Sequence, residues 1–131
     1  MILLTVDEII ELHKRITIAT GGASGIRDKG LLESAVLNCY QSFDGIALYP
    51  TIIEKAARMA YSISKNHPFV DGNKRIAVTS MLVLLRMNEI LLRYAQEDLI
   101  ALGLGVADGT IDYKGIVHWI RRYVLKEVGH M

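Results

Sequence analysis

Residues 76–85 read Ile-Ala-Val-Thr-Ser-Met-Leu-Val-Leu-Leu, and they are apolar on nearly every side of a helix. A helix of this kind belongs at the centre of a protein, because no face of it is suited to water. The segment contains Thr79 and Ser80 and is about half as long as a helix that spans a bilayer. We therefore expect a central buried helix with other helices packed around it, and no membrane partner.

The rest of the chain carries signals of further helices and few of the alternating patterns that are typical of strands. Thr5 and Glu8 form a capping box before a first helix that should end near the glycine pair 21–22. Pro50 suits the first turn of a third helix, because an N–H at that position would have no partner anyway. Other helices are expected from about Asp28 or Lys29, after Asn73, from Gln96 to about Leu104, and around Ile116 to Val124, following a turn at Asp108. The predicted fold class is all-α, a compact helical bundle in a single domain over residues 1–131.

Composition and charge restrict the class of protein. The chain has 131 residues, of which 51% are hydrophobic and 22% charged, as is ordinary for one globular domain. Because 15 basic residues nearly balance 14 acidic ones, no overall field attracts nucleic acid, and we expect no direct nucleic-acid partner. The single cysteine, Cys39, excludes an internal disulfide, and the N-terminal residues lack the pattern of a signal peptide. These features predict a cytoplasmic protein.

The segment with the most chemical content is 67–75, His-Pro-Phe-Val-Asp-Gly-Asn-Lys-Arg, directly before the apolar helix. Backbone N–H groups at a helix N-terminus have no intrahelical partner and attract anions. Gly72 leaves room for a phosphate, and Asn73 tolerates left-handed backbone angles. Lys74 and Arg75 add two positive charges, so these four residues predict a phosphate-binding site.

Three further side chains of the loop complete the predicted site. His67 carries an imidazole, the side chain most often used as a general base, and can take a proton from an attacking hydroxyl. Asp71 offers the hard oxygen ligand that Mg²⁺ prefers, with nucleotide phosphates as its other ligands. Phe69 is expected to anchor the loop on the core. A base, a metal ligand and a phosphate-binding loop together predict phosphoryl or nucleotidyl transfer.

Each of these residues has an ordinary structural interpretation when it stands alone. The sequence at 71–73 is a common turn, two adjacent basic residues such as 74–75 are usually solvated, and a lone His67 would be a helix-terminal residue. The remaining histidines are isolated in the sequence and are interpreted as structural or surface residues: His13, His118 and His130.

Taken together, residues 67–75 resemble the signature of the Fic/Doc family, His-x-Phe-x-Asp/Glu-Gly-Asn-Gly/Lys-Arg. Six fixed positions at this spacing should occur by chance in well under about one chain in 100,000. Residues 21–35, which include Gly-Ile-Arg-Asp-Lys-Gly-Leu-Leu-Glu-Ser-Ala, also look like the N-terminal half of the Doc (death-on-curing) branch. Length and helical plan are similar too, so the likeness covers nearly the whole chain.

The resemblance implies a toxin of a toxin–antitoxin pair. It implies that His67 is the general base, that Asp71 holds Mg²⁺, and that residues 72–75 shape the anion site and bind the phosphates of ATP. The reaction implied for the Doc branch is transfer of the terminal phosphate to a hydroxyl of elongation factor Tu, which arrests translation. The inhibitory motif Ser/Thr-x-x-x-Glu-Gly/Asn is absent from the sequence. If the site is restrained, a separate chain must therefore do it, and the partner that the resemblance implies is a Phd-type antitoxin whose flexible C-terminal segment folds into a nearby groove.

Two positions differ from the branch of the family that transfers AMP. Lys74 stands where that branch has a second glycine, and Val78 stands where it has a second arginine. Both differences favour the kinase reaction, whereas Gly72 differs from the alanine of Doc itself. The alternatives are AMP transfer to a protein hydroxyl, and an inactive module that binds an antitoxin as its co-repressor. A metal-dependent nuclease is a more distant alternative.

Overall fold

The structure is a computed structural model, and it describes residues 1–125. Within that part of the chain the regular elements are six helices and one short hairpin, so the predicted all-α class is confirmed. In chain order they are α1 (Val6–Thr20), α2 (Lys29–Asn38), β1 (Ser42–Phe43), β2 (Ile46–Ala47), α3 (Ile52–Asn66), α4 (Asn73–Met87), α5 (Gln96–Asp108) and α6 (Tyr113–Tyr123).

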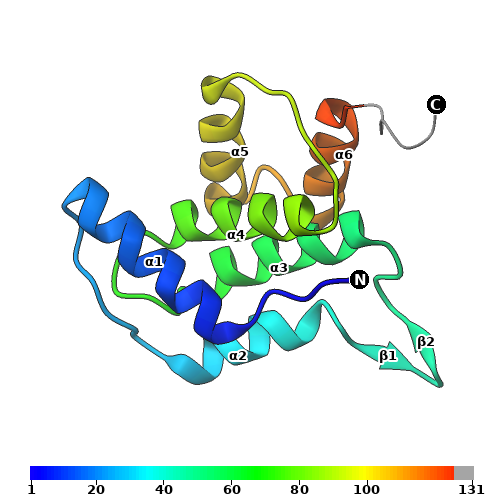
Figure 1. Ribbon diagram of the computed structural model, residues 1–131, viewed down its shortest axis with the longest axis horizontal. Coiled ribbons are helices and arrows are strands. Elements are labelled where there is room, and N and C mark those ends of the chain that lie inside the picture. Colours follow the sequence, from blue (N-terminus) through cyan, green and yellow to red (C-terminus); the bar gives the residue numbers. More distant parts are fainter. Residues whose placement is uncertain (126–131) are drawn as a thin grey trace.

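Helices α3 and α4 lie side by side and antiparallel at the centre of the molecule (Figure 1). Helix α4 contacts α1, α3 and α5, while α3 contacts α2, α4, α5 and α6. The predicted burial of the helix after the loop is therefore confirmed, and α3 shares the central position with it. Among residues 1–125, no helix is both long and apolar enough to cross a membrane.

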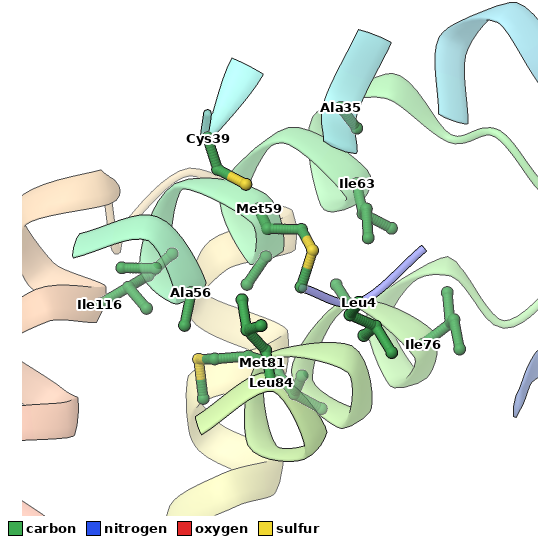
Figure 2. Close-up of a cluster of buried hydrophobic side chains, with 14 of the residues drawn as sticks. Leu4, Ala35, Cys39, Ala56, Met59, Ile63, Ile76, Met81, Leu84 and Ile116 are labelled. Carbon is green, nitrogen blue, oxygen red and sulfur yellow. The ribbon is translucent and has the colours of Figure 1, made fainter. Parts of the chain in front are cut away.

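The hydrophobic core is centred on the contact between α3 and α4 (Figure 2). Met59 of α3 and Met81 of α4 are completely buried there, and Leu4 of the N-terminal segment packs into the same cluster. Cys39, directly after α2, also lies in the core, where burial raises the pKa of its thiol to about 11. At neutral pH the thiol is therefore protonated and behaves as a small apolar side chain. Ile116 extends the core toward α6.

The helix ends follow the local signals of the sequence at most positions. Thr5 and Glu8 form the predicted capping box, because the Glu8 N–H donates to the Thr5 Oγ1 at 3.2 Å and the Thr5 N–H donates to the Glu8 Oε1 at 2.9 Å. Gly21 ends α1 in the left-handed conformation. Asp28 caps α2, since its Oδ1 accepts the Leu31 N–H at 3.1 Å.

The predicted place of Pro50 in the first turn of α3 is wrong. The helix begins at Ile52, and Thr51 is its N-cap, so Pro50 lies one residue before the cap. The hydroxyl of Thr51 accepts the Glu54 N–H at 3.1 Å, a bond that proline cannot provide.

Two other elements differ from the expectation. Helix α5 continues to Asp108 and does not end at about Leu104. Its last turns pack closely on the following turn, because a Cβ on Gly105 would clash with the Cδ1 of Ile111. The β1–β2 hairpin was not predicted. Its signal was the pair Asp44-Gly45, whose positive φ angles of 51° and 76° suit a two-residue hairpin turn.

Candidate active site

His67 occupies the junction between α3 and the loop that leads to α4. It is the C-cap of α3, with left-handed angles of φ 48° and ψ 56°, and its side chain is exposed. The ring Nδ1 lies 3.2 Å from the Lys65 carbonyl oxygen. Because a carbonyl only accepts, this contact assigns the proton to Nδ1 and leaves the lone pair on Nε2. In this tautomer the Nε2 of His67 is the ring nitrogen that can accept a proton.

Phe69 and Asn73 stabilise the conformation of the loop through contacts on its buried side. Phe69 is 1% exposed, and its ring stacks on the ring of His13, with centroids 3.9 Å apart and an interplanar angle of 12°. The Phe69 N–H donates to Asn73 Oδ1 and the Asn73 Nδ2 donates to the Phe69 carbonyl oxygen, both at 3.0 Å. The side-chain amide of Asn73 is therefore bonded to the loop backbone, so only the main-chain N–H of this residue remains for a ligand at the helix end.

The N-terminus of α4 is open. Gly72 is the N-cap, with φ +78°, and no side chain of residues 1–125 caps this end. The first N–H groups of a helix have no intrahelical partner and carry partial positive charge. Lys74 and Arg75, in the first turn, are both exposed. Unpaired N–H groups and two cations at one helix end are an arrangement that attracts anions such as phosphate.

Asp71 lies beside this helix end with its carboxylate exposed. Its Oδ1 accepts the Gly72 N–H at 2.8 Å, and its Oδ2 accepts the Ala23 N–H at 3.3 Å. Each oxygen keeps a further lone pair, so the oriented carboxylate can still bind a cation. Residues 1–125 contain no group of three or more His, Cys, Asp or Glu that could hold a metal by itself. A single carboxylate beside a phosphate site fits Mg²⁺, which is commonly held by one or two carboxylates plus substrate phosphates.

Residues 22–28, between α1 and α2, are bound along the loop. Val70 donates its N–H to the Gly25 carbonyl oxygen at 3.1 Å, and Arg27 donates its own to the Pro68 carbonyl oxygen at 2.7 Å. The Arg27 side chain donates to the carbonyl oxygens of His67, at 2.7 Å from Nε, and of Asn66, at 2.9 Å from Nη2. The conformation of the loop is therefore supported by a segment that lies far from it in the sequence.

A groove with a volume of about 850 Å³ joins these features. It is lined by α1, the loop, the first turns of α4, and α5. His67 and the residues 71–75 lie along it, and Phe69 does not line it but is buried in the core. Away from the loop, the lining is more apolar and includes Ile16, Val78, Leu99, Ile100, Leu104 and Ala107. The structure thus brings together every predicted polar residue of the site.

Two residues that support the site were not recognised from the sequence. His13 is 2% exposed, in agreement with its interpretation as a structural residue. Its Nε2 lies 2.7 Å from the Asp71 carbonyl oxygen, and this link to the loop was not predicted. The signal was its position four residues after the buried Ile9. Arg27 lies in the segment 21–35 that resembles the Doc branch, but no role was predicted for it. His118 is exposed on α6, and His130 lies outside the described residues.

Comparison with known proteins agrees with this arrangement. Residues 3–85, which contain the whole loop, match the Fic/DOC family. The chain belongs to the Fic/Doc family. Over 74 residues it is 40% identical to a Mycolicibacterium smegmatis protein named Toxin Doc, an alignment that covers 56% of this chain and 57% of that relative. Over 116 residues it is 29% identical to Protein kinase doc of Escherichia phage P1, with 88% and 90% covered.

Both relatives carry the name Doc, in agreement with the branch expected from the sequence. The chain spans little more than half the length of the Mycolicibacterium relative. As a member of the Fic/Doc family, it carries the signature loop between α3 and α4.

Proposed function

We propose that this Fic/Doc protein is the toxin of a toxin–antitoxin pair and transfers the terminal phosphate of ATP to a hydroxyl of elongation factor Tu, with Mg²⁺ as the metal. The observation that carries the proposal is the shared groove, which is lined by His67, by the carboxylate of Asp71 and by the open end of α4. The names Toxin Doc and Protein kinase doc support it for two relatives. Such a target would be met in the cytoplasm.

In this proposal each residue of the site has a role that its geometry supports. The Nε2 of His67 accepts the proton of the target hydroxyl, while Nδ1 holds the ring through the Lys65 carbonyl oxygen. The first N–H groups of α4, together with Lys74 and Arg75, bind phosphate oxygens. Mg²⁺ bound at Asp71 would neutralise charge that develops on the phosphates.

Lys74 and Val78 favour transfer of phosphate over transfer of AMP. Lys74 adds a charged side chain at the helix end, where a glycine would leave only backbone N–H groups. Val78 is 8% exposed and lines the groove one turn further on, so it supplies no second positive charge there. This arrangement favours presentation of the terminal phosphate, rather than the α-phosphate, to the acceptor beside His67.

ATP labelled separately at the α and γ positions tests the proposal, after incubation of the protein with elongation factor Tu and Mg²⁺. We expect label on the target only from the γ position. Label from the α position would establish AMP transfer instead, and no transfer from either position would favour the inactive co-repressor module. Lys74→Gly should lower γ transfer without efficient α transfer, whereas Lys114→Gly, at the same position of α6, should change neither.

The apolar part of the groove suggests where the antitoxin binds. Ile100 and Leu104, on successive turns of α5, are 54% and 51% exposed although both are large apolar residues. We propose that the C-terminal segment of a Phd-type antitoxin covers them. Leu104→Glu should weaken binding of an antitoxin encoded beside this gene by at least ~10-fold in calorimetry. Ile18 of α1 is 84% exposed and lies outside the groove, so Ile18→Glu should bind the antitoxin as the unmutated chain does.

A further inference from the structure

The backbone conformation of His67 requires support from its surroundings. Its φ of 48° and ψ of 56° lie in the left-handed region, which is unfavourable for any residue with a Cβ atom. Such a conformation persists only where neighbouring contacts stabilise it. The same angles end α3 and set the direction in which the imidazole leaves the chain, so whatever stabilises them also positions the ring.

Arg27 provides those contacts. Its Nε donates to the His67 carbonyl oxygen at 2.7 Å, and its Nη2 donates to the Asn66 carbonyl oxygen at 2.9 Å. Its main-chain N–H donates to the Pro68 carbonyl oxygen at 2.7 Å. One residue therefore binds three successive carbonyl groups, directly before, at and after the left-handed residue.

The charge and the shape of the Arg27 side chain both suit the C-terminal end of α3. The last carbonyl groups of a helix have no intrahelical donor and carry partial negative charge, which a cation stabilises. The planar guanidinium presents two N–H donors in a fixed geometry, so it can bind two adjacent carbonyl groups at once. Arg27 is itself held in place, because the next residue, Asp28, caps α2 and donates its N–H to the Pro68 carbonyl oxygen at 3.0 Å.

We propose that Arg27 is a positioning residue that holds His67 in its left-handed conformation and so keeps the imidazole in place in the groove that His67 lines. The inference rests on the proposed function, in which His67 is the base. The phosphate-binding end of α4 is supported by other contacts, among them the paired bonds between Asn73 and Phe69 and the bond between His13 and Asp71. Loss of Arg27 should therefore affect proton transfer at His67 more than it affects binding of ATP.

Steady-state phosphate transfer to elongation factor Tu tests the proposal. Arg27→Ala should lower kcat roughly 10- to 100-fold, as expected for a misplaced catalytic group, while KM for ATP changes less than about twofold. Arg27→Lys keeps the charge but has one donor nitrogen in place of the two that Arg27 uses, so its kcat should lie between those of Arg27→Ala and the unmutated chain. The matched control is Arg15→Ala, an exposed arginine on α1 whose partner is Glu11. An unchanged kcat in Arg27→Ala, or a rise in KM as large as the fall in kcat, would overturn the proposal.

Amide hydrogen exchange gives a readout that needs no activity. In Arg27→Ala the amides of His67, which donates to the Ile63 carbonyl oxygen, and of Val70, which donates to the Gly25 carbonyl oxygen, should exchange at least ~10-fold faster, while those of α6 and all amides of the Arg15→Ala control stay unchanged. If the unmutated chain transfers no phosphate, the proposed function fails, and unchanged exchange at His67 and Val70 would independently overturn the role of Arg27. If Arg27→Ala does not fold, the same measurements on Arg27→Lys decide, since exchange and kcat equal to those of the unmutated chain would contradict the need for two donor nitrogens in fixed geometry.

Discussion

At the scale of single residues, the imidazole of His67 and the carboxylate of Asp71 differ in how the structure holds them. The ring of His67 is exposed and has one ring nitrogen bonded to a carbonyl, whereas both oxygens of Asp71 accept backbone N–H groups. Within residues 1–125 the other ring nitrogen of the histidine has no hydrogen-bond partner, and the carboxylate is fixed in direction. This difference suits a base and a metal ligand, and each role can be tested by one substitution.

His67→Ala should lower the rate of phosphate transfer by ~10²–10⁴-fold, the usual loss when a general base is removed. The side chain is exposed, so the circular dichroism spectrum and the melting temperature should stay nearly unchanged. His118→Ala, an exposed histidine on α6, is the control and should keep full activity. Transfer at the unmutated rate in a folded His67→Ala protein would remove His67 from the mechanism.

Asp71→Asn should weaken Mg²⁺-dependent binding of ATP, because the amide keeps an acceptor for one backbone N–H but loses the charge that attracts the cation. Titration of Mg²⁺ at constant ATP should give a half-saturating concentration at least ~10-fold higher than in the unmutated chain. Asp44→Asn, in the turn of the β1–β2 hairpin, should leave the titration unchanged. If both variants have the same Mg²⁺ dependence, Asp71 only orders the loop.

At the scale of the elements, glycines in left-handed conformations set where α1 ends and where α4 begins. Gly21 has φ +76° and ends α1, and Gly72 has φ +78° and precedes α4. A Cβ on Gly21 would have nothing within 4 Å, and one on Gly72 would meet only His13 Nε2, at 3.6 Å, an ordinary contact. Alanine at either position therefore introduces mainly an unfavourable backbone conformation.

Gly72→Ala and Gly21→Ala should each lower the free energy of unfolding by about 1 kcal/mol, the cost of left-handed angles for a residue with a Cβ. Urea denaturation followed by circular dichroism measures both, and the two losses should agree within about 0.5 kcal/mol. A much larger loss in Gly72→Ala would mean that the contact with His13 is strained. Equal stability of all three proteins would contradict the backbone argument.

At the scale of the whole molecule, stability depends on the contact between α3 and α4, on which the remaining helices pack. Met81 is completely buried in this contact (Figure 2). Met81→Ala should therefore lower the free energy of unfolding by about 2–5 kcal/mol, through lost burial and the cavity that remains. Ile18 of α1 is 84% exposed, so Ile18→Ala should change the free energy of unfolding by less than about 0.5 kcal/mol. Similar losses in the two variants would show that this contact is not the centre of the core.

The sequence alone predicted the helical class, most helix ends and the membership of the loop in one site. These features follow from contacts between residues that are close in the chain, such as the Thr5–Glu8 capping box and the glycine that ends α1. It missed the hairpin and misplaced the start of α3 relative to Pro50, where two local signals compete for one helix end. Such helix ends can be predicted from the sequence because the residues that form them are neighbours in the chain, whatever the tertiary fold.

The support of the loop and the groove in front of it were decided only by the tertiary structure. His13 contacts Asp71 from 58 residues earlier in the chain, and Arg27 binds the carbonyl group of His67 from 40 residues earlier. Neither bond has a local pattern, because a histidine on a helix and an arginine in a loop bind whatever the packing of α1, α2, α3 and α4 brings within reach. The groove likewise combines α1, the loop and α5, whose proximity is set by how each helix buries its apolar face on α4.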